Sequence, residues 1–264
     1  ILNHKDTEAQ RFFEEKQSSF SLIPLCLCAS VVNQKMAKKV LCAMSGGVDS
    51  AVAALRCGPG AVAVTLELWR DTENDGERSC CSASAVRVAR RVAHDLGLPH
   101  FTLDLREEFR AGVVDPWLAD HAAGLTPNPC VRCNGHVRLD AMLAFAERLG
   151  AGSLATGHYA RTTDDALVRQ AVDPAKDQSY MLARLDPATT RRLCFPLGAS
   201  VKADVRAEAD RAGIAVAQKP DSQDLCFLAG TGKERFLARH GAQPERPGDV
   251  VEREGGALGR HRGA

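Results

Sequence analysis

The chain has 264 residues, of which 45% are hydrophobic and 25% are charged, and its formal net charge is +1. This length can supply one or two ordinary cores, which excludes a small fold held together by disulfides despite the 10 cysteines. The near-neutral charge does not indicate a polyanion partner, so nucleic-acid binding would depend on local basic patches. No apolar run approaches the ~18 to 20 residues of a membrane span, so we expect a cytoplasmic protein without a membrane partner.

The first 35 residues differ in composition from the rest. A short apolar stretch, residues 20–32, is rich in Ser and Cys, and a core-type strand begins only after Met36. A secretory signal has a basic leader, whereas residues 14–16 (Glu-Glu-Lys) give a mixed one. We interpret this segment as a leader or as an extension upstream of a natural start at Met36, and an organelle-targeting leader stays open.

From Met36 to about Thr156, apolar strands alternate with amphipathic helices. This alternation predicts an α/β fold with a doubly wound parallel sheet, whose ligands bind at the carboxyl ends of the strands. After about residue 160 the strand signals weaken, which indicates a second, smaller domain. We expect strands at 40–44, 61–66, 100–103 and 153–156, and helices near 48–57, 84–96, 106–122, 136–149, 176–185 and 202–212.

A glycine loop, residues 45–50 (Ser-Gly-Gly-Val-Asp-Ser), follows the first predicted strand directly. Its two glycines allow a tight turn and a close approach to a ligand, while Ser45, Ser50 and the amides that open the next helix offer donors to an anion. The pattern is not a Walker loop, because the chain contains no Gly-x4-Gly-Lys-Ser/Thr sequence. We interpret the anion as the pyrophosphate end of ATP, and the alternative is a strand-to-helix turn without a ligand.

Four further motifs follow in the chain. Residues 126–134 (TPNPCVRCN) contain two prolines that stiffen a loop and a Cys-x2-Cys pair. Residues 156–160 (TGHYA) come just after a predicted strand, so they are expected to face the same cleft as the glycine loop. Residues 176–182 (KDQSYML) and 219–227 (KPDSQDLCF) complete the set, and the last one contains a lone thiol.

In their order along the chain and in their residues, the five motifs resemble those of the tRNA-specific 2-thiouridylases, which belong to the ATP pyrophosphatase superfamily. The resemblance runs from about Lys38 to the last residue. It implies an adenine nucleotide alpha hydrolase-like catalytic domain over residues 36–162 and a central tRNA-binding domain over 163–240. Residues 241–264 would then be the start of a truncated C-terminal β-barrel domain.

The resemblance also implies roles for individual residues. Asp49 would help to position Mg²⁺ beside ATP. The target base would meet Asn128, Pro129 and Cys130. The tRNA would meet His158, Lys176, Asp177 and Gln178. The ATP site would consist of Ala43, Met44, Ser45, Gly46, Gly47, Val48, Asp49, Ser50, Leu66 and Gly157.

Catalysis, by the same resemblance, would depend on cysteines. Cys133 matches the nucleophile, and Cys226 matches the thiol that carries persulfide sulfur from a sulfur donor or carrier protein. Cys130 is a departure, because many relatives have Asp at this position. Three cysteines could instead hold a [4Fe-4S] cluster with one open iron, or a zinc ion together with His136. The sequence leaves these sulfur routes open.

The implied function is thiolation of tRNA with a wobble uridine. ATP would adenylate the C2 oxygen, and sulfur would then displace AMP, giving 2-thiouridine, AMP and pyrophosphate. Two alternatives stay open: a small-molecule amide-forming ATP pyrophosphatase, and a noncatalytic, truncated tRNA-binding homologue.

Other notable residues have ordinary structural interpretations. Cys42, Cys57 and Cys194 are expected to be small core residues. The adjacent Cys80 and Cys81 are interpreted as incidental. Trp69 either closes one side of the nucleotide site or packs in the core.

Overall fold

The computed structural model describes residues 39–70, 83–221, 225–241 and 247–261. The predicted leader over residues 1–35 lies outside the described residues, and so do Cys80 and Cys81. In the described part of the chain, no helix is long and apolar enough to cross a membrane.

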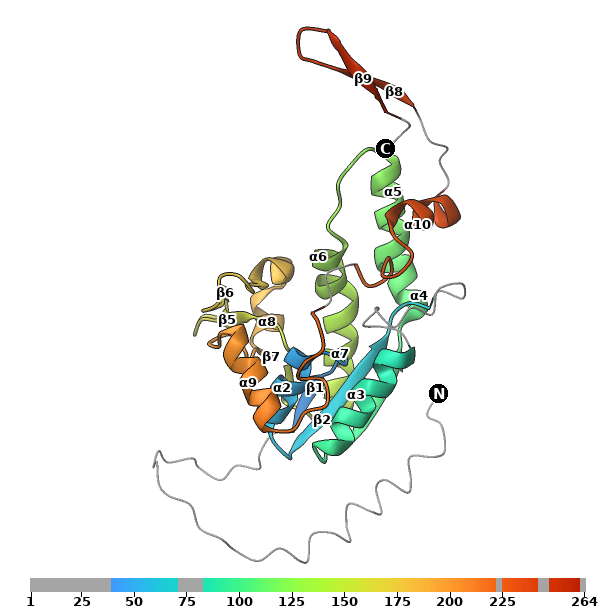
Figure 1. Ribbon diagram of the computed structural model, residues 1–264. Coiled ribbons are helices and arrows are strands. Elements are labelled where there is room, and N and C mark those ends of the chain that lie inside the picture. The colour runs from blue at the N-terminus through green and yellow to red at the C-terminus, as the bar shows by residue number, and fades with distance from the viewer. Residues whose placement is uncertain (1–38, 71–82, 222–224, 242–246, 262–264) are drawn as a thin grey trace, which may run out of the picture. The chain divides into compact units, whose positions relative to one another are not determined.

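A five-stranded sheet lies at the centre of the fold (Figure 1). Its order is β3-β2-β1-β4-β7, and every neighbouring pair is parallel. The predicted α/β class and parallel sheet are confirmed, and the first four strands lie within two residues of their predicted ranges. The strands are β1 (Val40–Ala43), β2 (Ala61–Glu67), β3 (His100–Asp104), β4 (Ser153–Ala155) and β7 (Leu193–Cys194).

Two hydrophobic clusters cover the two faces of the sheet. Consecutive residues of a strand point to opposite faces, and accordingly Leu41 belongs to one cluster and Cys42 to the other. The Cys42 side packs against α2 (Val48–Cys57), α3 (Ala83–Asp95) and α9 (Lys202–Arg211). The Leu41 side packs against α7 (Leu139–Arg148) and its neighbours. Burial on both faces explains why β1 and β2 are almost continuously apolar.

The helices predicted near 106–122 and 136–149 are present, but each is joined to a π-helical turn. The first consists of α4 (Arg106–Phe109), the π turn Arg110–Val114 and α5 (Asp115–Ala122). In the second, α6 (Pro129–Cys133) and the π turn Asn134–Arg138 lead into α7. Widened turns of this kind occur frequently at functional sites.

The predicted helix over residues 176–185 is wrong. Only a 3₁₀ turn, Ser179–Leu182, forms there. The carboxylate of Asp177 accepts hydrogen bonds from the backbone N–H groups of Ala171 and Ser179, and from the hydroxyl of Ser179. These side-chain bonds hold the backbone in a turn and compete with a regular helix. The predicted helix over 202–212 is confirmed as α9.

The remaining elements are short. Two antiparallel hairpins form, β5 (Ala160–Thr162) with β6 (Val168–Gln170) and β8 (Gly248–Val251) with β9 (Ala257–His261). Two further helices are α8 (Pro187–Thr190) and α10 (Lys233–His240).

The three cysteines expected in the core have different environments. Cys42 is fully buried, as predicted, and Cys57 is half-buried. The prediction for Cys194 is wrong, because its residue is exposed in the edge strand β7. An edge strand has a neighbour on one side only, so its side chains are covered less completely.

Candidate functional site

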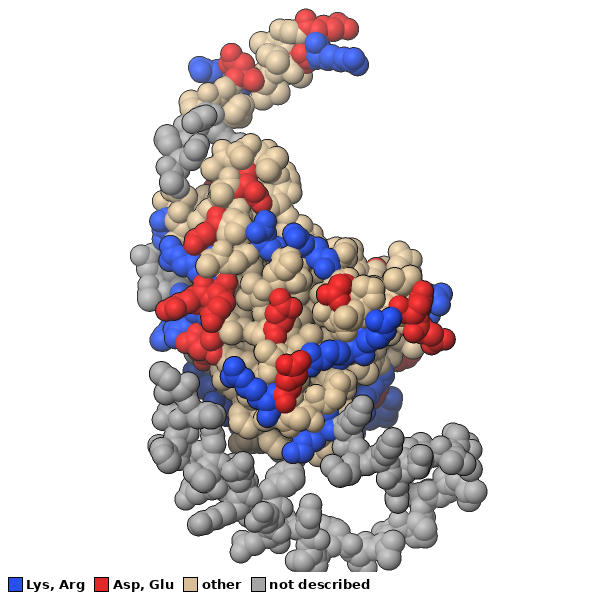
Figure 2. All heavy atoms as spheres, turned by 180° about the vertical axis from the view of Figure 1, so that it is seen from behind, with Lys and Arg blue, Asp and Glu red and all other residues tan. Residues whose placement is uncertain are grey.

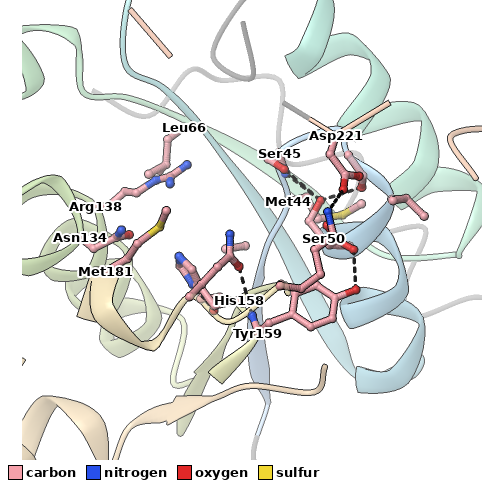
Figure 3. Close-up of a pocket in the computed structure, with 18 of the residues that line it drawn as sticks. Met44, Ser45, Ser50, Leu66, Asn134, Arg138, His158, Tyr159, Met181 and Asp221 are labelled. Carbon is pink, nitrogen blue, oxygen red and sulfur yellow. Dashed lines mark hydrogen bonds and ion pairs between the residues drawn. The ribbon is translucent and has the colours of Figure 1, made fainter. Parts of the chain in front are cut away.

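A pocket of about 440 Å³ lies at the carboxyl edge of the sheet (Figure 3). This volume is within the ~300–1,000 Å³ of small-molecule sites. Segments from six parts of the chain form its wall: the loop after β1, the end of β2, the turn into α7, the segment after β4, residues 175–181 and residues 219–221. Of the residues predicted to bind ATP or tRNA, it brings together Ala43, Met44, Ser45, Gly47, Val48, Asp49, Ser50, Leu66, Gly157, His158, Lys176, Asp177 and Gln178.

The glycine loop is held by its own hydroxyl group and by a close neighbour. Ser50 Oγ accepts from the N–H of Ser45 at 3.1 Å and donates to the carbonyl of Gly47 at 3.0 Å. Gly46 has a φ of +73°, and a Cβ atom there would lie 2.8 Å from the backbone oxygen of Ala85. Because no side chain caps the start of α2 at Gly47, the first N–H groups of this helix remain available to an anion.

Gly157 supports the loop from the opposite side. A Cβ atom at this position would lie 2.9 Å from the backbone nitrogen of Ser50. Only glycine therefore lets the segment after β4 approach the start of α2 this closely.

The carboxylate of Asp49 is bonded to a lysine ammonium group and to a tyrosine hydroxyl group. Its two carboxylate oxygens lie 2.6 and 2.7 Å from Lys202 Nζ, and Oδ1 accepts from the hydroxyl of Tyr159 at 2.9 Å. Burial, followed by the charge of Asp49, raises the pKa of Tyr159, so this hydroxyl stays protonated. A magnesium ion on Asp49 would have to displace the ammonium group, so the carboxylate in this arrangement does not fit the predicted role.

A second carboxylate, that of Asp221, forms ion pairs with three cationic side chains. Its oxygens lie 2.9 Å from Lys176 Nζ and 2.8 Å from both Lys202 Nζ and Arg206. Burial raises the pKa of Asp221, but the hydrogen bonds from Lys202 and Lys176 outweigh it and lower the value to about 2. Lys219 completes the phosphate-loop end of the pocket, because its Nζ donates to the carbonyl of Gly46 at 2.9 Å.

The opposite end of the pocket lies near the π turn before α7. Figure 3 shows Asn134, Arg138 and Met181 on this side, away from Ser45 and Ser50. His158 is bonded through Nδ1 to Thr156 Oγ1 at 2.8 Å. Burial and the charge of Arg138 lower the pKa of His158 to about 4, so the ring is neutral near pH 7.

The three residues predicted to contact tRNA after β6 all have partners within the protein. Lys176 is bonded to Asp221, and Gln178 Oε1 accepts from the N–H of Tyr159 at 3.1 Å. Asp177 accepts from its own turn, and the bonds from Ala171 and Ser179 lower its pKa although burial opposes them. All three residues line the pocket, so their bonds within the protein also fix the shape of the pocket wall.

The predicted catalytic cysteines do not line the pocket. Cys133 is buried at the end of α6, while Cys130 and Cys226 are half-buried. Asn128 caps α6 by accepting from the N–H groups of Cys130 and Val131. Cys133 belongs to the hydrophobic cluster on the Leu41 side of the sheet, and Cys226 packs against that same cluster.

The predicted iron–sulfur and zinc sites are not assembled in this structure. Among the described residues, no three His, Cys, Asp or Glu side chains are placed so that they could hold a metal ion. The thiols of Cys130, Cys133 and Cys226 therefore do not fit a cluster in this arrangement.

An aromatic cluster holds the residue after Cys226. The Phe227 ring is 3% exposed and packs edge-on against Trp117, Phe109 and Trp69, with centroid distances of 5.2, 5.9 and 6.5 Å. Trp69 also contacts Phe236 and does not line the pocket, so it is a packing residue.

Local sequence patterns do not indicate Tyr159, Lys202, Lys219 or Asp221 as site residues. Lys219 and Asp221 stand inside a recognised motif, but their roles depend on partners that are far away in sequence. Lys202 opens a helix with no motif around it, and no local pattern indicates its pairing with Asp49.

Together, the parallel sheet, the glycine loop and the pocket beside it define an α/β domain with a site for a phosphate-bearing ligand. The model of the family described as "tRNA methyl transferase HUP domain" matches residues 38–230. The chain belongs to this family.

Similar curated proteins are named tRNA-specific 2-thiouridylase MnmA. The protein of Salinispora tropica is 49% identical over 232 residues, which are 86% of this chain and 64% of that protein. The protein of Frankia alni is 48% identical over 231 residues, 85% of this chain and 65% of that protein. A "Bifunctional protein NifU/MnmA" of Rubrobacter xylanophilus is 48% identical over 227 residues, 85% of this chain and 46% of that protein. The chain thus spans slightly less than two thirds of the first two relatives.

Proposed function

We propose that this chain forms the ATP-binding and sulfur-transferring part of a tRNA 2-thiouridylase. The observation that carries the proposal is the shared pocket, which unites the glycine loop with Gly157, His158 and the segment Lys176–Gln178. The names of the relatives support the same activity. Because the relatives are longer, the activity of a whole 2-thiouridylase is part of this proposal.

The first step is activation of the base. The N–H groups at the start of α2 bind the phosphates of ATP, and the C2 oxygen of the wobble uridine attacks the α-phosphorus. Pyrophosphate leaves, and C2 becomes electrophilic because its oxygen is now part of an AMP leaving group. Asn128, Pro129 and Cys130 are proposed to meet the target base, and His158 with residues 176–178 is proposed to meet the tRNA.

The second step is sulfur transfer through two thiols. A sulfur donor leaves a persulfide on Cys226, and its terminal sulfur attacks C2 and displaces AMP. Cys133 thiolate then attacks the Cys226 sulfur, which breaks the bond to the transferred sulfur. The products are 2-thiouridine and a Cys133–Cys226 disulfide, which an external dithiol reduces before the next cycle. The persulfide is the sulfur source of this proposal, because the described residues place no three thiols so that they could hold a cluster.

In this proposal, three segments of the chain have different roles. Residues 36–162 form the ATP-binding catalytic domain, with residues 163–240 as a central tRNA-binding domain. Residues 241–264 form the start of a β-barrel domain, and their hairpin β8–β9 supplies its first two strands. On the face shown in Figure 2, Lys and Arg alternate with Asp and Glu, so tRNA contact there depends on local groups of cations.

The test is mass spectrometry of digested tRNA after incubation with the protein, ATP, magnesium and unmodified tRNA. One arm uses metal-free protein with a persulfide donor, and the other uses protein reconstituted anaerobically with iron and sulfide. The proposal expects 2-thiouridine in the persulfide arm, with loss of product in Cys133→Ser and Cys226→Ser. Cys194→Ser is the matched control, because Cys194 is an exposed cysteine in β7.

Product only in the reconstituted arm would reject the persulfide route and keep the thiolation. Product in neither arm, with ATP binding intact, would reject the thiolation. Unchanged AMP production in both cysteine variants would instead favour an ATP pyrophosphatase that does not transfer sulfur.

A further inference from the structure

Lys219 reaches the glycine loop from a distant part of the chain. Its half-buried side chain lines the pocket, and Nζ donates to the carbonyl of Gly46, which is 173 residues away in sequence. A lysine ammonium has three N–H donors, so this bond leaves two for a ligand in the pocket.

The other cations at this end of the pocket are paired with carboxylates. Lys202 bridges Asp49 and Asp221, while Lys176 and Arg206 bond to Asp221. Within the described residues, no carboxylate is paired with Lys219. An incoming anion can therefore balance the charge of Lys219 without breaking an ion pair among the described residues.

The location of this charge selects one part of a nucleotide. The ammonium lies against the loop whose N–H groups precede and open α2, where a chain of phosphates would bind. The ammonium therefore favours a ligand that places phosphate oxygens at this loop over a nucleoside.

We propose that Lys219 is a pyrophosphate-binding residue, which holds the β- and γ-phosphates of ATP against the glycine loop. The inference rests on the proposed function for the identity of its ligand.

The first test measures binding to the 264-residue protein by calorimetry with ATP, inorganic pyrophosphate and AMP. Because a hydrogen bond to a charged group is involved, Lys219→Met is expected to weaken binding of ATP and pyrophosphate roughly 10- to 100-fold. Binding of AMP should be unchanged. Lys219→Arg should retain part of the affinity, and Lys233→Met, an exposed lysine at the start of α10, is the matched control.

The second measurement is circular dichroism, which confirms that each variant is folded.

Equal losses for AMP and ATP, or no loss for pyrophosphate, would overturn the assignment. If Lys219→Met behaves as expected but no 2-thiouridine forms in the thiolation assay, the proposed function fails while the pyrophosphate assignment stands. If the unaltered protein binds neither ATP nor pyrophosphate, both fail.

Discussion

Replacement of Lys202 by methionine tests the electrostatics of the pocket most directly. The Lys202 side chain is 11% exposed, and its ammonium lies 2.6 Å from Asp49 and 2.8 Å from Asp221. Methionine keeps the length of the side chain but leaves two carboxylates, 31% and 21% exposed, with one cation fewer between them. Removing one partner of a buried ion pair costs ~3–5 kcal/mol.

The expected cost is below that range, because both carboxylates keep other partners. Tyr159 still donates to Asp49, and two cations still bond to Asp221. We expect the free energy of unfolding to fall by about 2–3 kcal/mol in Lys202→Met. For a chain of this size, that corresponds to a decrease of about 4–12 °C in Tm.

The assay is urea unfolding followed by circular dichroism, with thermal melts alongside. Glu147→Gln is the control, because it breaks the exposed pair of Glu147 with Arg192 and should cost only ~0–1 kcal/mol. Adding Asp49→Asn to Lys202→Met should recover part of the loss, since it removes a carboxylate that lacks its cation. A loss in Lys202→Met no larger than that of the control would refute the reasoning.

Four further changes test the site and its support. The pKa of Asp221 is about 2 in the folded protein, against an ordinary value of 3.8. Its contribution to stability is therefore complete above pH 3.8 and is lost as the pH falls toward 2. In Asp221→Asn, the free energy of unfolding should change less with pH in this window. The pKa of His158 is about 4 in the folded protein, against an ordinary value of 6.5. Between these pH values the unfolded chain binds a proton that the folded protein does not, so stability falls as the pH falls from 6.5 to 4. His158→Asn should remove this loss of stability. Gly157→Ala should displace the loop at Ser50 and weaken ATP binding in calorimetry, at a stability cost of about 1–3 kcal/mol, and unchanged ATP affinity would contradict the close contact. Phe227→Ala should lower the free energy of unfolding by about 3–5 kcal/mol in urea, and a loss under 1 kcal/mol would show that the aromatic cluster closes without it.

The sequence was sufficient for the parts of the fold that local patterns determine. Strands β1 to β4 are apolar runs that end at polar or glycine residues, and the glycine loop follows β1 without interruption. Strand β7 could not be predicted, because two residues, Leu193–Cys194, carry no periodicity. The π turn at Asn134–Arg138 could not be predicted either, because the spacing of its apolar residues is also compatible with an ordinary α-helix.

The site itself was predictable only where motifs exist. Predicted residues on both sides of the pocket, such as Ser45, Leu66 and Gly157, do line it. The ion pair between Asp49 and Lys202 joins residues 153 positions apart, and neither neighbourhood indicates the other. Long-range charge pairing of this kind depends on how the chain folds back, which residue spacing does not encode.

Strand β7 and helix α9 limit how the protein can be divided for experiments. Both come from the segment after residue 162, yet β7 pairs with β4 in the central sheet and α9 packs against α2. A fragment that stopped at residue 162 would expose the open edge of β4 and the apolar face of α2, where Val205 and Ala209 now pack. Exposed strand edges recruit other chains, so such a fragment would tend to aggregate when expressed alone. A stable minimal protein for crystallisation or labelling should therefore extend through α9.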